Sequence, residues 1–188
     1  MNTPAHLALS LAVLGRRASP REWAVIGAGA ILPDLVLYLR YAASGQITDA
    51  AGGALRVAID LFNSVPLYAV ALALALMAGR RWLVLFAASA LLHVLTDFAL
   101  HADDARAHFW PLTGWVFHSP VSFWDHAHHG RWAGLLEGVL FAACMVVILR
   151  RHRAVWVQAV VLALTAIYAL SFVHFLGHAF ADRHWAPW

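Results

Sequence analysis

Histidine and acidic side chains recur at helical spacing in one apolar stretch of this sequence. His93, Asp97 and His101 are spaced i, i+4 and i+8, which places them along one face of a helix. Such a histidine and carboxylate can bind one divalent cation, and the next histidine can bind a neighbouring cation or orient the first ligand. Simple hydrogen-bonded pairs share this spacing, so both interpretations stay open.

Other apolar stretches carry similar residues at a matching depth. Each lies 10 to 13 residues from the arginine that ends its own stretch, or roughly 15–20 Å along a helix. The four are His6, Asp34, His93 and Glu137. A charged side chain in lipid costs roughly 2.5–3.5 kcal/mol, so these groups are expected to face one another or a watery cavity. The pattern predicts a cation site built from several helices.

Asp34 has a second signal beside it. Pro33 removes one helix hydrogen bond and frees a carbonyl next to the carboxylate. A bend there can direct Asp34 toward the other polar groups. The alternative is an ion pair of Asp34 with an arginine such as Arg40 or Arg56.

The composition requires a membrane to position these residues. Of 188 residues, 62% are apolar and 12% are charged, against roughly 45–50% and 25% in soluble domains. A single cysteine, Cys144, excludes a disulfide framework and a cysteine-based zinc site. The 13 basic residues form no long stripe, so nucleic acid is not an expected partner.

Five stretches with at most one charged residue are long enough to cross a bilayer. They cover residues 23–39, 61–79, 82–102, 132–149 and 154–181, and residues 4–15 form a shorter apolar run. We therefore predict an all-α fold. It is a single membrane domain over residues 1–188, with a bundle of five transmembrane helices and a short N-terminal helix.

Arginine clusters predict the orientation. They occur at residues 16–21, 80–81 and 150–153, at every second connection, as cytoplasmic loops do. The polar residues then face outward, beneath loops at residues 41–60 and 102–131. The expected location is the bacterial inner membrane, with the site toward the periplasm or exterior.

The second of these outer loops is rich in histidine, acid and aromatic residues. Aromatic side chains are typical of membrane interfaces, which makes lipid headgroups the nearest substrates. Asp125, His128 and His129 are candidates for acid–base catalysis or further ligation, and Arg106 and Arg131 for holding an anionic headgroup. A solvated surface loop is the alternative.

Short motifs carry a family resemblance. Thr3-Pro4-Ala5-His6, Pro33-Asp34, Asn63-Ser64 and Leu92-His93 followed by Asp97 resemble the membrane-bound metal-dependent hydrolases described as LexA-regulated inner-membrane proteins. That family is distantly related to phospholipase C and to a class of zinc-dependent nucleases. The segments around Asp60 and the loop at 102–131 look like an uncharacterised bacterial subgroup sometimes labelled cobalamin biosynthesis proteins. The resemblance implies metal ligation by His6, Asp34, His93 and Asp97.

One position departs from the family pattern. Asn63 stands where the family usually has a histidine, and an upstream histidine is absent. Three alternatives stay open: Asp60 takes the place of that histidine, the number of metal ions differs, or catalysis has been lost.

These observations predict a metal-dependent hydrolase that acts on a phosphoester of a membrane lipid or lipid-linked substrate. The cofactor is a divalent metal, with zinc expected at His6, Asp34, His93 and Asp97. Further roles fall to the catalytic candidates Asp60, His101, Asp125, His128 and His129, to the substrate contacts Arg106, Arg131 and Ser64, and to Glu137 as an additional polar group. The alternatives are a non-enzymatic metal or proton transport protein, and a haem or quinone protein using His93 and His174.

Overall fold

The chain is all-α in the computed structural model, which describes residues 1–42, 49–123 and 125–181. The helices in these ranges are α1 (Thr3–Leu14), α2 (Pro20–Ala42), α3 (Asp49–Phe62), α4 (Val65–Met77), α5 (Arg81–Ala99), α6 (Gly130–Arg151) and α7 (Val155–Ala181). Two short 3-10 turns, Gly15–Arg17 and His126–His128, complete the described elements. The predicted fold class is confirmed.

Helix length and hydropathy make this a multi-pass membrane protein. Helices α2, α5, α6 and α7 are each long and apolar enough to cross a bilayer, and α3 with α4 forms a fifth candidate that is bent by 48°. The apolar stretch predicted over 61–79 therefore belongs to this bent pair, with a break between α3 and α4 at Asn63 and Ser64. Ser64 starts a new helix because its hydroxyl accepts the backbone N–H of Leu67, and Pro66 fits the first turn of α4.

Helix α3 replaces part of the outer loop predicted at 41–60. Leu55, Ile59 and Phe62 recur at helical spacing along it, and Ile59 is buried. Glycine costs only about 1 kcal/mol in a helix, so Gly53 does not end α3. Gly52 and Gly53 together are typical of a turn, yet both lie inside α3.

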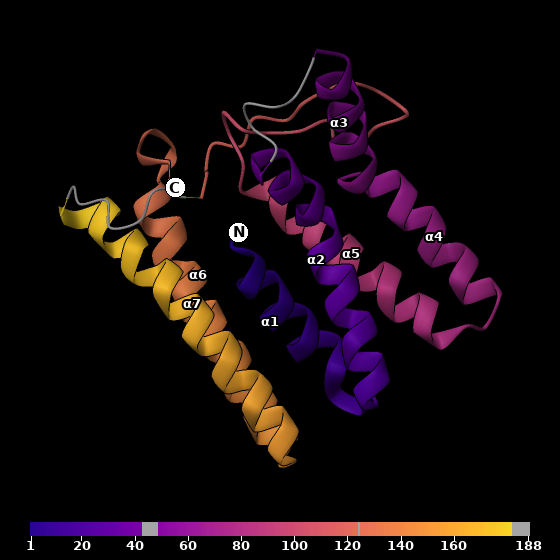
Figure 1. Cartoon of the computed structure of the whole chain (residues 1–188), viewed down its shortest axis with the longest axis vertical. Helices are drawn as coiled ribbons and strands as arrows, with labels where there is room; N and C mark the ends of the chain where they lie inside the picture. Colours follow the sequence, from indigo (N-terminus) through magenta and orange to yellow (C-terminus); the bar gives the residue numbers. More distant parts are fainter. Residues whose placement is uncertain (43–48, 124, 182–188) are drawn as a thin grey trace.

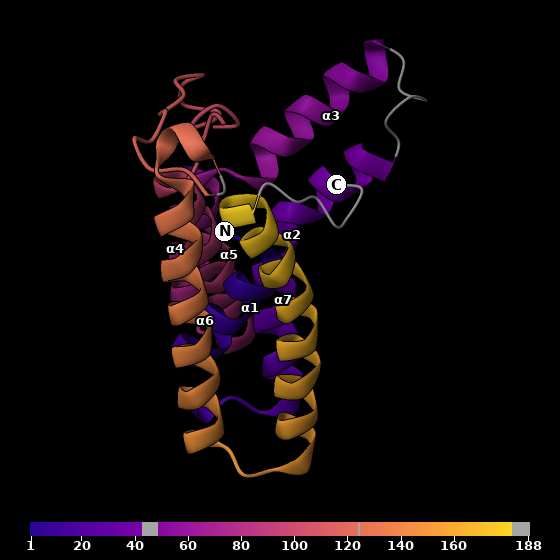
Figure 2. The ribbon, with the colours of Figure 1, turned by 90° about the vertical axis from the view of Figure 1, so that its left-hand side faces the viewer.

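Helix α1 is short and lies in the middle of the bundle. It packs against α2 and α5 on one side and against α6 and α7 on the other, as Figure 1 shows. Figure 2 shows α6 and α7 running antiparallel beside it. The guanidinium of Arg151 donates to the carbonyl of Ala12 at 2.6 Å, which ties the end of α1 to α6.

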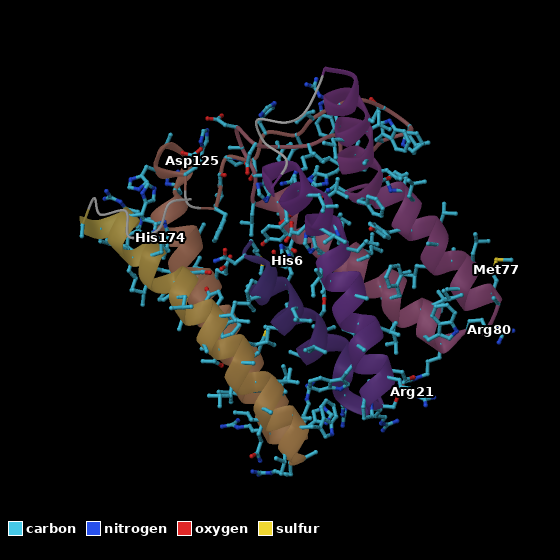
Figure 3. The ribbon with its side chains drawn as sticks, viewed as in Figure 1. His6, Arg21, Met77, Arg80, Asp125 and His174 are labelled. Carbon is cyan, nitrogen blue, oxygen red and sulfur yellow. The ribbon has the colours of Figure 1, made fainter. Side chains whose placement is uncertain are left out.

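The two ends of the bundle differ in chemistry. Arg21 and Arg80 lie at one end, and Asp125 and His174 lie at the other (Figure 3). At the arginine end, Ser19 and Glu22 bond each other's backbone N–H and cap α2, and Arg81 donates to Glu22 at 2.7 Å. At the opposite end, the loop after α5 folds back on that helix through Ser119 N–H to His101 O and Phe123 N–H to Leu100 O, both 2.9 Å.

Candidate metal centre

Close packing of α2 against α5 positions the first ligand. A Cβ on Gly29 would lie 2.4 Å from the carbonyl oxygen of Phe86, so the two backbones approach more closely than any larger residue allows. Across this contact Ser89 donates to the carbonyl of Ile26 and His93 Nδ1 bonds the carbonyl of Ala30, both at 2.7 Å. A carbonyl only accepts, so Nδ1 of His93 carries the proton and Nε2 carries the lone pair.

Three buried side chains from three helices meet at this point. His6 from α1, Asp34 from α2 and His93 from α5 each offer a ligand atom, and these atoms lie within 4.8 Å of one another. The rings of His6 and His93 stack with centroids 3.6 Å apart. His6 and His93 are each 1% exposed and Asp34 is 8% exposed. Thr3 from α1 donates its hydroxyl to Asp34.

Asp97 lies against the same two histidines. Its Oδ1 is 2.9 Å from His6 Nε2 and 3.3 Å from His101 Nε2, and its Oδ2 is 3.3 Å from His93 Nε2. Arg106 Nη1 approaches Oδ2 at 3.4 Å, and the amino group of Met1 lies 3.0 Å from Oδ1. The structure thus brings together the four residues expected to bind metal.

His6, His93 and His101 each direct Nε2 at a carboxylate, and the other ring nitrogen, Nδ1, lies within hydrogen-bond distance of an oxygen atom. His6 Nδ1 lies 3.2 Å from the hydroxyl oxygen of Thr96, and His101 Nδ1 lies 2.7 Å from Asp104 Oδ2. Metal-binding histidines characteristically donate their other ring N–H to an oxygen in this way. Nε2 of His93 and of His101 is buried and forms no hydrogen bond with the described residues.

A nitrogen lone pair that faces a carboxylate is unfavourable unless a proton or a cation lies between them. Nε2 of His6 lies at hydrogen-bond distance, 2.9 Å, from Asp97 Oδ1 and can donate there if it carries the proton, whereas His93 already carries a proton on Nδ1. Two protonated rings stacked at 3.6 Å would repel by about 5 kcal/mol at an effective dielectric constant of 20. A cation shared by His6 and His93 leaves both rings neutral and offsets Asp34 and Asp97, so the donor set fits a divalent metal with nitrogen and oxygen ligands.

The centre opens into a cavity of about 270 Å³. Its polar lining includes Asp34, Asp97, His101 and Arg106. Burial alone would lower the pKa of His101, but its bonds to Asp104 and Asp97 raise the pKa above the ordinary value. Burial alone would raise the pKa of Asp104, and the bond from His101 reverses this, so the Asp104 pKa is lowered.

Several predicted residues lie outside the centre. Glu137 shares the predicted depth but accepts bonds from Tyr168 at 3.0 Å and from Asn2. Ser64 is fully buried and its hydroxyl bonds Trp110 O and Leu67 N–H.

Asp60 lies in a neighbouring cavity of about 570 Å³, which also borders Arg106. His174 lies on α7, away from His6 (Figure 3).

The loop candidates gather at a second place. His128 Nδ1 bonds Asp125 Oδ2 at 2.7 Å, and Asp103 brings a third ligand atom within 4.8 Å of theirs, so this partly exposed group has ligand spacing too. His129 lines an apolar cavity of about 360 Å³. The Arg131 guanidinium lies 5.9 Å from the ring centroid of Phe180.

Three supporting residues were not singled out from the sequence. Thr96 lies on α5 three residues after His93, and Asp104 lies three residues after His101 in the turn that follows α5. His108 is buried, and its Nδ1 bonds the carbonyl of Asn63 at 2.9 Å. No local spacing signals His108, because the loop must fold back before it reaches α4.

The side chain of Asn63 makes three hydrogen bonds. Its amide donates to the carbonyls of Ile59 at 2.9 Å and Pro33 at 3.3 Å, and its oxygen accepts from Arg106 at 3.3 Å. Asn63 therefore joins α2, α3 and Arg106 beside the centre, where the family pattern expects a histidine.

Comparison of the chain with protein-family models, with curated proteins and with solved structures found no match. Kinship with the membrane-bound hydrolases therefore stays a prediction from the short motifs.

Proposed function

We propose that this protein is a membrane-embedded, metal-dependent hydrolase that cleaves a phosphoester of a lipid or lipid-linked substrate. The observation that carries the proposal is the convergence of His6, Asp34, His93 and Asp97, with each histidine held through Nδ1. A bound divalent ion, with zinc expected, would supply Lewis acidity and lower the pKa of a water from about 15.7 toward 7.

Residues around the 270 Å³ cavity supply the remaining functions. Arg106 is 13% exposed in its side chain and borders the space beside Asp97, where it can hold an anionic oxygen. His101, oriented by Asp104, lines the same space with Nε2 directed at Asp97, and is placed to move a proton. Asp34 and Asp97 supply the negative charge that a bound cation would offset, and Arg106 and the amino group of Met1 balance part of that charge.

A transport pathway is less well supported. Between His6 and the arginine end, α1 packs in an apolar core that includes Leu11, Ile26, Leu85 and Ile148. This core separates the centre from the arginine end. The arginines favour that end as cytoplasmic, so we place the centre toward the periplasm or exterior of a bacterial inner membrane.

Elemental analysis of the purified protein tests the proposal first. We expect at least one stoichiometric divalent ion per chain in the wild type, and its loss in His93→Ala and Asp97→Ala. His152→Ala is the matched control, because His152 packs on Trp23 at the arginine end. A metal-free wild type, or equal metal in all four proteins, contradicts a metal centre.

Phosphoester hydrolysis is the second measurement. Short-chain phospholipids in mixed micelles should release a phosphate-containing product only with metal-loaded protein, and His93→Ala should abolish release. Metal-coupled flux into liposomes without any hydrolysis would favour transport instead.

A further inference from the structure

A second cavity beside the centre carries charges of both signs. This cavity, of about 570 Å³, is lined by two arginines, two aspartates and an indole ring: Arg56, Arg106, Asp60, Asp104 and Trp110. It lies between α3 and the loop that follows α5. We call it the mixed-charge cavity.

The arginines and aspartates that line the mixed-charge cavity do not form direct ion pairs with one another. Within the described residues, no ion pair of 4 Å or less joins either arginine to either aspartate. Asp104 bonds His101, and Arg106 uses Nη1 alone for Asn63 and Asp97. The side chains of Arg56 and Asp60 form no hydrogen bond with any described residue. Charged groups held apart around one cavity can bind a ligand of complementary charges.

Arg106 connects the mixed-charge cavity to the metal centre. Leu37 and Arg106 line both this cavity and the 270 Å³ cavity that holds Asp34, Asp97 and His101. A phosphate bound to Arg106 would therefore lie at the boundary between the two cavities, next to the metal centre. The group esterified to that phosphate extends into the mixed-charge cavity.

Resting on the proposed hydrolase, we propose that the mixed-charge cavity binds a phosphate ester that carries an amine, of the phosphoethanolamine or phosphocholine type. The phosphate pairs with Arg106 and Arg56, and the ammonium group lies among Asp60, Asp104 and the face of Trp110. Carboxylates and indole rings both attract an ammonium ion. An uncharged glycerol headgroup would leave the two aspartates facing a ligand that offers them no positive charge.

Binding of short-chain lipids to the zinc-loaded protein tests this. Dihexanoyl-phosphatidylethanolamine and dihexanoyl-phosphatidylcholine should bind at least tenfold more tightly than dihexanoyl-phosphatidylglycerol by isothermal titration calorimetry. Asp60→Asn, which keeps the side-chain size, should reduce that preference to less than threefold. Arg106→Gln should weaken all three lipids, and Arg80→Gln, at the opposite end of the bundle, should change none.

Free phosphoethanolamine distinguishes the two sources of this headgroup. Competition with the lipid at similar concentration identifies a soluble phosphate ester, whereas binding of the lipid alone identifies a membrane lipid, and both support the proposal. Equal affinity for phosphatidylglycerol, or an unchanged preference in Asp60→Asn, overturns it.

The same titration on His93→Ala measures lipid binding separately from hydrolysis, because this variant should be inactive. In the wild type, a headgroup preference without hydrolysis would refute only the proposed function. Hydrolysis with no headgroup preference would refute only this inference.

Discussion

Replacing Thr96 by valine tests whether His6 is held as a metal ligand. The hydroxyl of Thr96 donates to the carbonyls of His93 and Leu92, at 2.8 and 3.0 Å, so its oxygen is left to accept Nδ1–H of His6 at 3.2 Å. That bond directs the Nε2 lone pair of His6 toward the centre. Valine keeps the shape of the side chain and removes the acceptor.

The expected loss is about tenfold in zinc affinity. Removing an oxygen that orients a metal-binding histidine costs roughly 10–100-fold in affinity, or about 1.4–2.7 kcal/mol. The bond to His6 is long at 3.2 Å and only part-buried, which places the effect near the lower limit. Competition with a zinc chelator of known affinity, at constant pH in detergent, measures the change.

Ser89→Ala is the matched control. It also removes a hydroxyl bond on α5, from Ser89 to the carbonyl of Ile26 at 2.7 Å, about two turns from Thr96. This variant should lose about 1 kcal/mol of unfolding free energy and keep its zinc affinity. Wild-type affinity in Thr96→Val, or an equal loss in both variants, would refute the assignment of His6.

Three further expectations concern stability. Gly29→Ala should destabilise the protein by about 1–3 kcal/mol, because its Cβ would meet the Phe86 carbonyl at 2.4 Å, whereas Gly27→Ala meets only an ordinary contact at 3.5 Å and should be tolerated in thermal unfolding. A chelator should lower the melting temperature of the wild type, and at a free zinc concentration 100 times Kd the restored stability should be about 2.7 kcal/mol; equal melting curves with and without chelator contradict a metal centre. Burial lowers the pKa of His108, so the unfolded chain binds more protons than the folded one and stability should fall as pH drops below about 6.5. His108→Gln should show a smaller loss of melting temperature between pH 7.5 and 5.5, and an identical loss would contradict this reasoning.

Depth along a helix could be predicted from the sequence, but direction around it could not. Rise per residue and the cost of charge in lipid together predict one level for His6, Asp34 and His93, and Asp97 follows His93 by one turn of the same helix. Glu137 satisfies the same arithmetic, yet it bonds Tyr168 and Asn2 and does not join the centre. Helix rotation depends on packing, such as the close contact at Gly29, which no count of residues shows.

The residues that bond Nδ1 of the histidines could not be predicted from the sequence, for a different reason. Asp104 reaches His101 only because the loop turns immediately after α5, and His108 reaches Asn63 across 45 positions. Helix α3 was missed because Gly52-Gly53 is typical of a turn. Periodicity therefore identified the proposed ligands more readily than the residues that orient them.

The central place of α1 has a consequence for biogenesis. α1 leaves the ribosome before the other helices, yet it is clamped by α6 and α7, and Asn2 bonds Glu137 across 135 positions. The packing of α1 is therefore complete only after α6 and α7 have been synthesised and inserted. Because the four proposed ligands lie on α1, α2 and α5, a chain interrupted before α6 would contain all of them but would lack the two helices that cover the other side of α1.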